Sequence, residues 1–323
     1  METITLEQKT KLESEKRCRE LLETLKKGSD TTNVVIPDSV TEIGCRAFSE
    51  CNCLASIVIP NSVTEIGDSA FSKCISLASI VIPNSVTEIG DSAFSKCISL
   101  TSIVIPKSVT EIGESAFEYC GGLTSIVIPE SVIKIGRHAF FGCSSLTSIV
   151  IPDSVTEIGE SVFEYCGGLT SIVIPNSVTK IGRRAFEGCS SLTSIVIPDS
   201  VTEIAESAFE YCGGLTSIVI PNSVTKIGRR AFGGCSSLTS IVIPDSITEI
   251  GESAFSGCGT LTMKKNDEKQ GETAASNIPK PEQKKQTIDE IHRKVRDEIR
   301  KALINNCPIP NPKIKLPDFK GMK

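Results

Sequence analysis

A unit of 23 residues recurs ten times in this chain without insertion or deletion, and this repeat constrains the fold more than any other feature. One copy, starting at Leu100, reads Leu-Thr-Ser-Ile-Val-Ile-Pro-Lys-Ser-Val-Thr-Glu-Ile-Gly-Glu-Ser-Ala-Phe-Glu-Tyr-Cys. Proline recurs at this interval from Pro37 to Pro244, and phenylalanine and cysteine recur in the same way. A unit this short cannot bury its apolar face alone and must stack on its neighbours. The sequence therefore predicts a solenoid whose coils all have one length.

The first half of each unit is typical of a short β-strand. Leu100 is followed by Ile103 and Ile105 in a period-two alternation rich in β-branched residues, and Pro106, which lacks an amide donor, ends the strand. We expect Leu and Ile to point inward and the intervening Ser and Val to form the outer surface of a parallel sheet. This surface is the candidate binding face, and its central residues are Ser102, Val104, Ser125, Val127, Ser148, Val150, Ser171, Val173, Ser194 and Val196.

The segment Ser-Val-Thr-Glu-Ile-Gly predicts a second short parallel strand on another side of the coil, ending at Gly113. In one unit the threonine of this segment is replaced by Ile133, which indicates a buried position. We therefore expect Thr110 and Ile112 to face inward and Glu111 to face outward.

The end of each unit predicts one helical or 3₁₀ turn, because Ala116, Phe117 and Cys120 lie at helical spacing. The phenylalanine should fill the coil. Two interpretations of the recurrent cysteine are open. Paired strands of neighbouring coils lie about 4.8 Å apart, near the lower end of disulfide Cα separations, so adjacent cysteines could be bridged. Alternatively, each is a buried thiol that packs as a small apolar group and directs its S–H towards loop backbone.

The pattern Leu-x-x-Ile-x-Ile-Pro-x-Ser-Val-Thr-x-Ile-Gly-x-x-Ala-Phe-x-x-Cys resembles the BspA-type leucine-rich repeat over residues 34–262. The resemblance implies an α/β repeat: a right-handed leucine-rich-repeat solenoid with short parallel strands and one helical turn per coil. It also implies a role in binding or adhesion, often at a cell surface. It supplies no catalytic residues, because the residues of the motif are structural.

The repeat divides the chain into five segments. Residues 1–33 contain a capping box, Thr5-x-x-Gln8, and predict an amphipathic helix that caps the array. Residues 34–262 form the ten-unit solenoid, and the polar, charged residues 263–286 form a linker. Residues 287–306 open with a second capping box and predict another amphipathic helix. The Pro-rich residues 307–323 should be extended, either as a disordered tail or as a peptide ligand for a partner.

From the fourth unit onward, the outward charges alternate in sign from one unit to the next. Glu111 and Glu114 are followed one unit later by Lys134 and Arg137, and the alternation continues to Glu249. This predicts a ladder of ion pairs between coils. It argues against nucleic-acid binding, which requires a continuous basic stripe. Glutamates stack without intervening lysine in the first four units, as either an acidic binding strip or a solvated face.

No motif in the sequence indicates catalysis, a cofactor or a metal. The thiols of Cys45, Cys51 and Cys53 lack the paired spacing of a zinc site, and His138 stands where later units have arginine. Paired catalytic carboxylates need unlike environments, whereas identical units supply identical ones.

We therefore expect a non-enzymatic protein–protein interaction scaffold that takes no cofactor and binds protein partners without entering a membrane. The sequence has no secretory signal, transmembrane segment or lipid anchor, which predicts a cytoplasmic location. The alternative is a cell-surface adhesin or antigen, exported by an unrecognised route, that binds host or matrix proteins. A third hypothesis makes the C-terminal helix and tail the ligand and the array a spacer.

Overall fold

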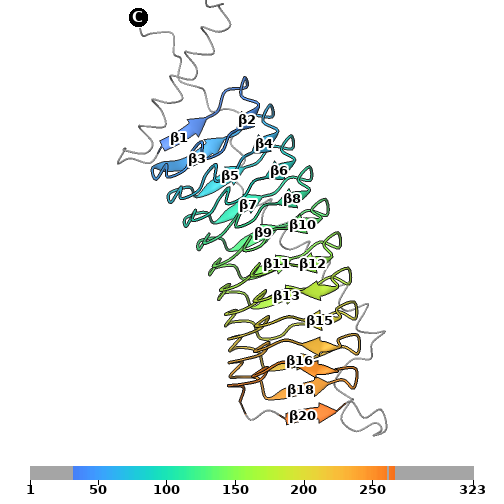
Figure 1. The fold of residues 1–323 in the computed structure, drawn as a ribbon. Helices are drawn as coiled ribbons and strands as arrows, with labels where there is room; N and C mark the ends of the chain where they lie inside the picture. The colour runs from blue at the N-terminus through green and yellow to red at the C-terminus, as the bar shows by residue number, and fades with distance from the viewer. Residues whose placement is uncertain (1–31, 260–261, 266–323) are drawn as a thin grey trace, which may run out of the picture. The chain divides into compact units, whose positions relative to one another are not determined.

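In the computed structural model, which describes residues 32–259 and 262–265, the chain winds into a solenoid of stacked coils (Figure 1). Most coils contribute one strand to each of two faces, and neighbouring coils pair in parallel. The pairing register follows the repeat, so that Ile103 lies beside Ile126 and Ile112 beside Ile135. The predicted solenoid of parallel strands with 23 residues per coil is therefore confirmed.

The first face carries the longer strands. Its seven-stranded sheet consists of β1 (Thr32–Val35), β3 (Leu54–Val58), β5 (Ser79–Val81), β7 (Ser102–Val104), β9 (Ser125–Val127), β11 (Ser148–Val150) and β13 (Ser171–Val173). A single bridge between Val173 and Val196 continues it. A three-stranded sheet follows, with β16 (Ser217–Val219), β18 (Ser240–Ile243) and β20 (Thr262–Lys265).

The second face consists of two-residue strands in two five-stranded sheets. The first sheet contains β2 (Glu42–Ile43), β4 (Glu65–Ile66), β6 (Glu88–Ile89), β8 (Glu111–Ile112) and β10 (Lys134–Ile135). The second contains β12 (Glu157–Ile158), β14 (Lys180–Ile181), β15 (Glu203–Ile204), β17 (Lys226–Ile227) and β19 (Glu249–Ile250).

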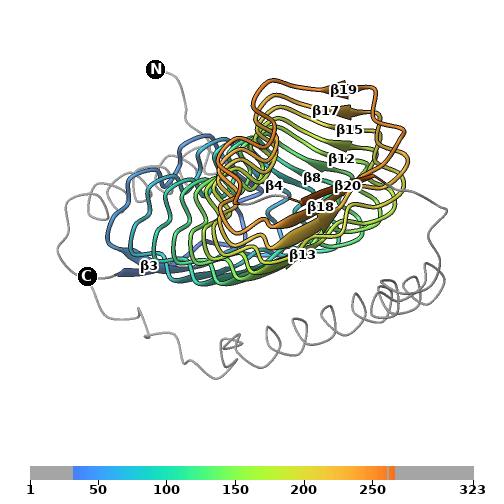
Figure 2. The ribbon, with the colours of Figure 1, turned by 90° about the horizontal axis from the view of Figure 1, so that it is seen from below.

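The core is a set of side-chain columns that run through the interior of the coils. Figure 2 shows the stacked coils nearly end on. Leu100, Ile103 and Ile105 point inward as predicted, together with Val109 and Ile112. The phenylalanines form a continuous stack from Phe48 to Phe255, in which neighbouring ring centroids lie 5.3–5.6 Å apart with nearly parallel planes. Each coil is therefore complete only when its neighbours are present, as expected for a repeat array.

The predicted helical turn is wrong, and the described residues contain no helix. Successive backbone amides in this segment donate alternately to a carbonyl of the same coil and to a carbonyl of the next coil. Ala116 N donates to Gly113 O within its own coil, whereas Phe117 N donates to Ala139 O of the next coil. Ser115 (φ 55°) and Tyr119 (φ 55°) have left-handed backbone, and their amides also donate to the next coil, to Arg137 O and Phe141 O. A helix would use the amides internally, whereas this chain of turns uses half of them to hold the next coil.

The predicted burial of the threonine column is also wrong. Thr110 is exposed, and Ile133, which replaces threonine in its coil, is 65% exposed. The residues that face inward here are Ile112, from the two-residue strand, and Val109, from the turn that precedes the strand. The Val109 amide closes this turn by donating to Pro106 O. Several threonine hydroxyls of this column donate to the carbonyl one coil back, as Thr179 Oγ1 does to Thr156 O at 3.3 Å.

Strand pairing extends beyond the predicted solenoid limits of 34 and 262. Strand β1 begins at Thr32, and β20 continues to Lys265, within the predicted linker. The predicted N-terminal helix lies almost entirely outside the described residues, as do most of the linker, the helix at 287–306 and the tail at 307–323.

Candidate interaction surface

The Ser/Val face, defined as the outward Ser and Val side chains of the first face, has the arrangement expected from the repeat. Ser102 pairs with Ser125 and Val104 with Val127, and this register continues along β11 and β13. The intervening isoleucines are buried. The residues of the predicted set that this register brings together are Ser102, Val104, Ser125, Val127, Ser148, Val150, Ser171 and Val173.

Two parts of the Ser/Val face depart from a uniform array. Ser194 and Val196 belong to no strand, although the bridge to Val173 keeps Val196 in line with the column. Val104 is 40% and Val196 59% exposed, whereas Val150 is only 8% exposed. The face offers methyl groups and hydroxyls without ionisable side chains, so any binding there must rest on shape, apolar contact and hydrogen bonds. Its binding role stays a prediction.

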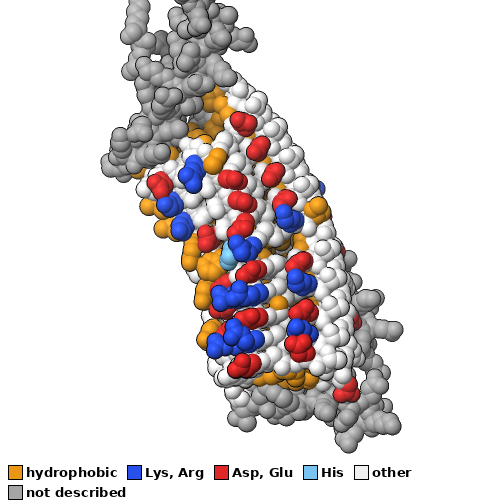
Figure 3. All heavy atoms as spheres, in the orientation of Figure 1, with side chains coloured by type: hydrophobic (Ala, Val, Ile, Leu, Met, Phe, Trp, Pro, Cys, Tyr) orange, Lys and Arg blue, Asp and Glu red, His pale blue; other side chains and the backbone are white. Residues whose placement is uncertain are grey.

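The second face and the turn that follows it in each coil carry the predicted ion-pair ladder. Pairs one coil apart join Lys134 to Glu111, Arg137 to Glu114 at 3.0 Å, Lys180 to Glu157 at 3.2 Å, Arg183 to Glu160 at 3.3 Å, Arg229 to Glu206 at 2.6 Å and Lys226 to Glu249 at 3.3 Å. Figure 3 shows acidic side chains stacked over the upper coils and alternating signs below them. The prediction of alternating pairs between coils is confirmed.

A second charged column lies deeper in the surface. Glu164, Glu187 and Glu210 occupy one position in three consecutive coils and are nearly buried. Arg184 lies 3.4 Å from Glu187 and 4.0 Å from Glu164, and Arg230 lies 3.5 Å from Glu210. Burial raises the pKa of the Glu187 carboxyl, with a further contribution from the repulsion by Glu164 that Arg184 opposes.

The cysteine column consists of thiols that are buried from Cys74 to Cys235 and half-buried at Cys258. From Cys74 to Cys258, each Sγ donates to the carbonyl of a phenylalanine in the preceding coil, at 3.0–3.2 Å. Burial raises the pKa of Cys97 and of Cys166 to about 12. The thiols are therefore protonated at neutral pH and unreactive, as the second interpretation of the sequence predicted.

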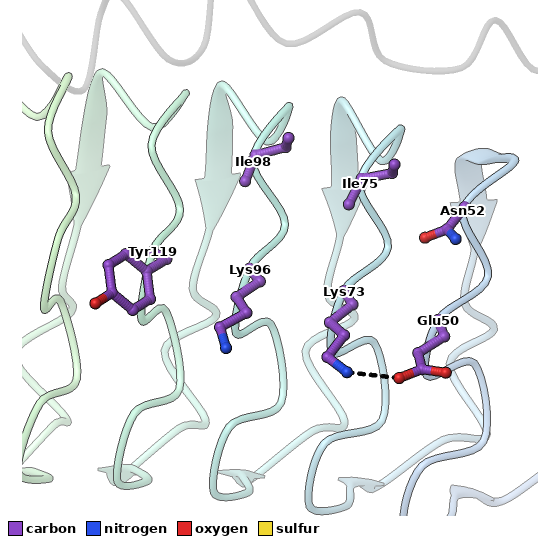
Figure 4. Close-up of a pocket in the computed structure, with 7 residues that line it drawn as sticks. All are labelled: Glu50, Asn52, Lys73, Ile75, Lys96, Ile98 and Tyr119. Carbon is purple, nitrogen blue, oxygen red and sulfur yellow. Dashed lines mark hydrogen bonds and ion pairs between the residues drawn. The ribbon is translucent and has the colours of Figure 1, made fainter.

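The sequence did not predict a groove on the turn side of the first coils. Glu50, Asn52, Lys73, Ile75, Lys96, Ile98 and Tyr119 line it (Figure 4). Lys73 pairs with Glu50 at 2.6 Å, and Lys96 Nζ lies 5.8 Å from the centre of the Tyr119 ring. The sequence does distinguish these coils from the others, since later units have glycine or serine at the positions of Ile75 and Ile98.

Within residues 32–259 and 262–265, no group of three or more His, Cys, Asp and Glu side chains is arranged to hold a metal ion. Over the same ranges, the structure has no helix with the length and apolar character needed to span a bilayer.

Comparison with known proteins agrees with this architecture. The model of the BspA type leucine-rich repeat region (6 copies) matches residues 24–147 and 134–262. A solved leucine-rich repeat protein from Bacteroides ovatus is similar, with 37% identity and a TM-score of 0.69. The match covers 72% of this chain and 63% of that one, so this chain spans less than two thirds of that protein.

Two other solved structures show weaker similarity, each at 29% identity. A leucine-rich cell surface protein from Faecalibacterium prausnitzii has a TM-score of 0.38, with 75% of this chain and 89% of that chain covered. A leucine-rich repeat protein from T. pallidum has a TM-score of 0.40, with 64% and 78% covered. A search of curated proteins gave no significant match. The family match and the coil geometry together show that this chain belongs to the BspA-type leucine-rich repeat family.

Proposed function

We propose that this protein is a non-enzymatic protein–protein interaction scaffold whose Ser/Val face binds a protein partner. The observation that carries the proposal is the exposed valine column set in register on a sheet, as at Val58, Val104 and Val219. Valine methyl groups beside serine hydroxyls give a surface that buries apolar area and still satisfies hydrogen bonds at its rim.

The repetition of this face favours an extended or multivalent partner. The same pair of side chains is presented coil after coil, so a partner with several equivalent contact points gains avidity from binding them together. A partner with one small epitope would gain nothing from the length of the array. The predicted absence of catalysis fits this role, since the face contains no titratable side chain that could transfer a proton.

Capture experiments with the full-length chain test the proposal. The double variant Val104→Asp/Val196→Asp places two charges on the Ser/Val face, and Thr87→Asp/Thr179→Asp places two on exposed positions of the second face as a matched control. We expect the first variant, but not the control, to lose the proteins captured by the wild type, with melting temperatures of both checked. Equal capture by both variants would refute the proposal. Loss of capture on replacing residues 307–323 by a Gly/Ser segment would instead assign the binding to the tail.

We also propose that the scaffold acts in the cytoplasm. The column from Cys74 to Cys258 consists of thiols rather than disulfides, as is usual in a reducing compartment. Protease treatment of intact cells tests this proposal, because an adhesin on the surface would be degraded and a cytoplasmic scaffold would be protected.

A further inference from the structure

The groove of Figure 4 combines cationic and apolar side chains in a way found in only a few coils. Ile75 and Ile98 are 41% and 53% exposed, respectively, although most isoleucines of the array are buried. They lie in one column, two residues beyond Lys73 and Lys96 in their coils. The coil structure does not require isoleucine at this position, since later coils of the same structure have serine or glycine there.

The two lysines differ in their charge environment. Lys73 pairs with Glu50, whereas no carboxylate of the described residues lies within ion-pair distance of Lys96. The nearby Glu118 accepts a hydrogen bond from Ser95 Oγ at 3.2 Å. The Tyr119 ring holds the Lys96 ammonium beside the groove by a cation–π contact. Lys96 is thus a positioned cation that can receive an anionic group from outside.

The dimensions of the groove favour an extended peptide segment. Phenylalanine rings of these coils stack at 5.3–5.4 Å, so the four coils from Glu50 to Tyr119 span about 16 Å, or about five residues of extended chain. The groove has no free strand edge, because Lys73 N and Lys96 N donate to carbonyls of the next coil. Side chains must therefore supply the recognition.

We propose that this groove binds an extended acidic segment of a partner protein. One carboxylate of the segment pairs with Lys96, and branched apolar side chains cover Ile75 and Ile98. This site goes beyond the proposed scaffold function, since it lies on the turn side of the first coils and shares no residue with the Ser/Val face.

Binding of defined pentapeptides to the full-length chain tests the proposal. The probe is acetylated and amidated Asp-Ile-Asp-Ile-Asp, and the matched peptides are Lys-Ile-Lys-Ile-Lys and Asp-Ser-Asp-Ser-Asp. Methyl NMR, with Ile75→Val and Ile98→Val used for assignment, follows the titration. We expect only the first peptide to shift both methyl signals strongly, with affinity falling as salt rises from about 20 to 200 mM because exposed charge pairs are screened.

Variants connect the signal to the groove. Lys96→Glu should weaken binding about tenfold, since it replaces attraction with repulsion, and Ile98→Ser should weaken it about fivefold through lost apolar burial. The exposed Lys107→Glu, outside the groove, and Val104→Asp should change affinity less than twofold. Equal binding of the acidic and basic peptides, or unchanged affinity in Lys96→Glu, would overturn the proposal. Either result would leave the function proposed for the Ser/Val face untouched.

Discussion

Replacing Gly182 by alanine should destabilise the array, because this glycine lies against the backbone of the preceding coil. Its amide donates to Ile158 O at 2.8 Å. A Cβ at this position would lie 2.8 Å from Gly159 C and 2.9 Å from the carbonyl oxygens of Gly159 and Ile158. These atoms belong to the backbone and cannot rotate away, so the two coils would have to separate locally.

The protein contains one natural example of this accommodation. Ala205 occupies the same position one coil later, and its amide lies 3.2 Å from Ile181 O, compared with 2.8 Å at Gly182 and at Gly228. The methyl group thus coincides with a longer hydrogen bond. Overpacking of this kind costs about 1–3 kcal/mol, and alanine recovers about 0.4–1 kcal/mol by restricting the unfolded chain. We expect Gly182→Ala to lower the free energy of unfolding by about 1 to 2 kcal/mol.

Gly159→Ala is the matched control, since it lies in the same column one coil earlier. A Cβ there would contact only Val162 Cγ2 at 3.7 Å and Ile135 O at 3.8 Å, both ordinary packing distances. It should leave the protein equally stable or up to about 1 kcal/mol more stable. Urea unfolding followed by circular dichroism compares the two midpoints. Equal midpoints for the two variants would refute the argument that close approach of coils sets the requirement for glycine.

Three further predictions test the charges and thiols. Glu157→Lys with Glu160→Lys should lower the free energy of unfolding by about 1–2 kcal/mol at low salt, since exposed ion pairs are worth about 0–1 kcal/mol each. This loss should shrink at high salt, where the charges are screened. Reversing the cationic partners of both glutamates as well should restore the melting temperature. Glu187→Gln should stabilise the protein at neutral pH, because the raised pKa of the Glu187 carboxyl means that its ionisation opposes folding. This gain should disappear as the pH falls to the ordinary pKa of a glutamate, where the carboxyl is protonated in both states, and a pH-independent gain would contradict the prediction. Cys45→Ser should remove one fast-reacting thiol in a native titration with a disulfide reagent, whereas Cys166→Ser should remove none, because only the first is exposed.

Much of this fold could be predicted because the repeat fixes the register. Once Ile103 is assigned inward, the alternation of the strand places Val104 outward, and the same holds for Val58, Val81 and Val219 in other coils. The same spacing brings Glu157 and Lys180 side by side, so the ion pair follows from charge and period alone. The buried thiols follow from an apolar environment repeated in every coil.

The turn segment was less predictable, because its spacing is compatible with a helix and with linked turns. A position with left-handed backbone can usually be predicted because glycine occupies it, but here Ser115 and Lys96 adopt this conformation. The available signal was the alternation of Tyr119 with Gly142 and of Tyr165 with Gly188 at one position. The single isoleucine of the threonine column, Ile133, does not indicate burial, because an apolar side chain is tolerated at this exposed position.

The same hydrogen-bonding pattern explains why binding specificity should lie in departures from the repeat. Amides that reach the next coil, such as Phe117 N, require a neighbour of the same shape, so the residues that hold the coils together cannot vary freely. Outward positions carry no such restriction. The Ser/Val face repeats along the array and suits a multivalent partner, whereas Ile75, Lys96 and Ile98 occur only near one end and suit a single short segment. Two surfaces of different valence can therefore act on one solenoid, and variants confined to one surface should leave binding at the other unchanged.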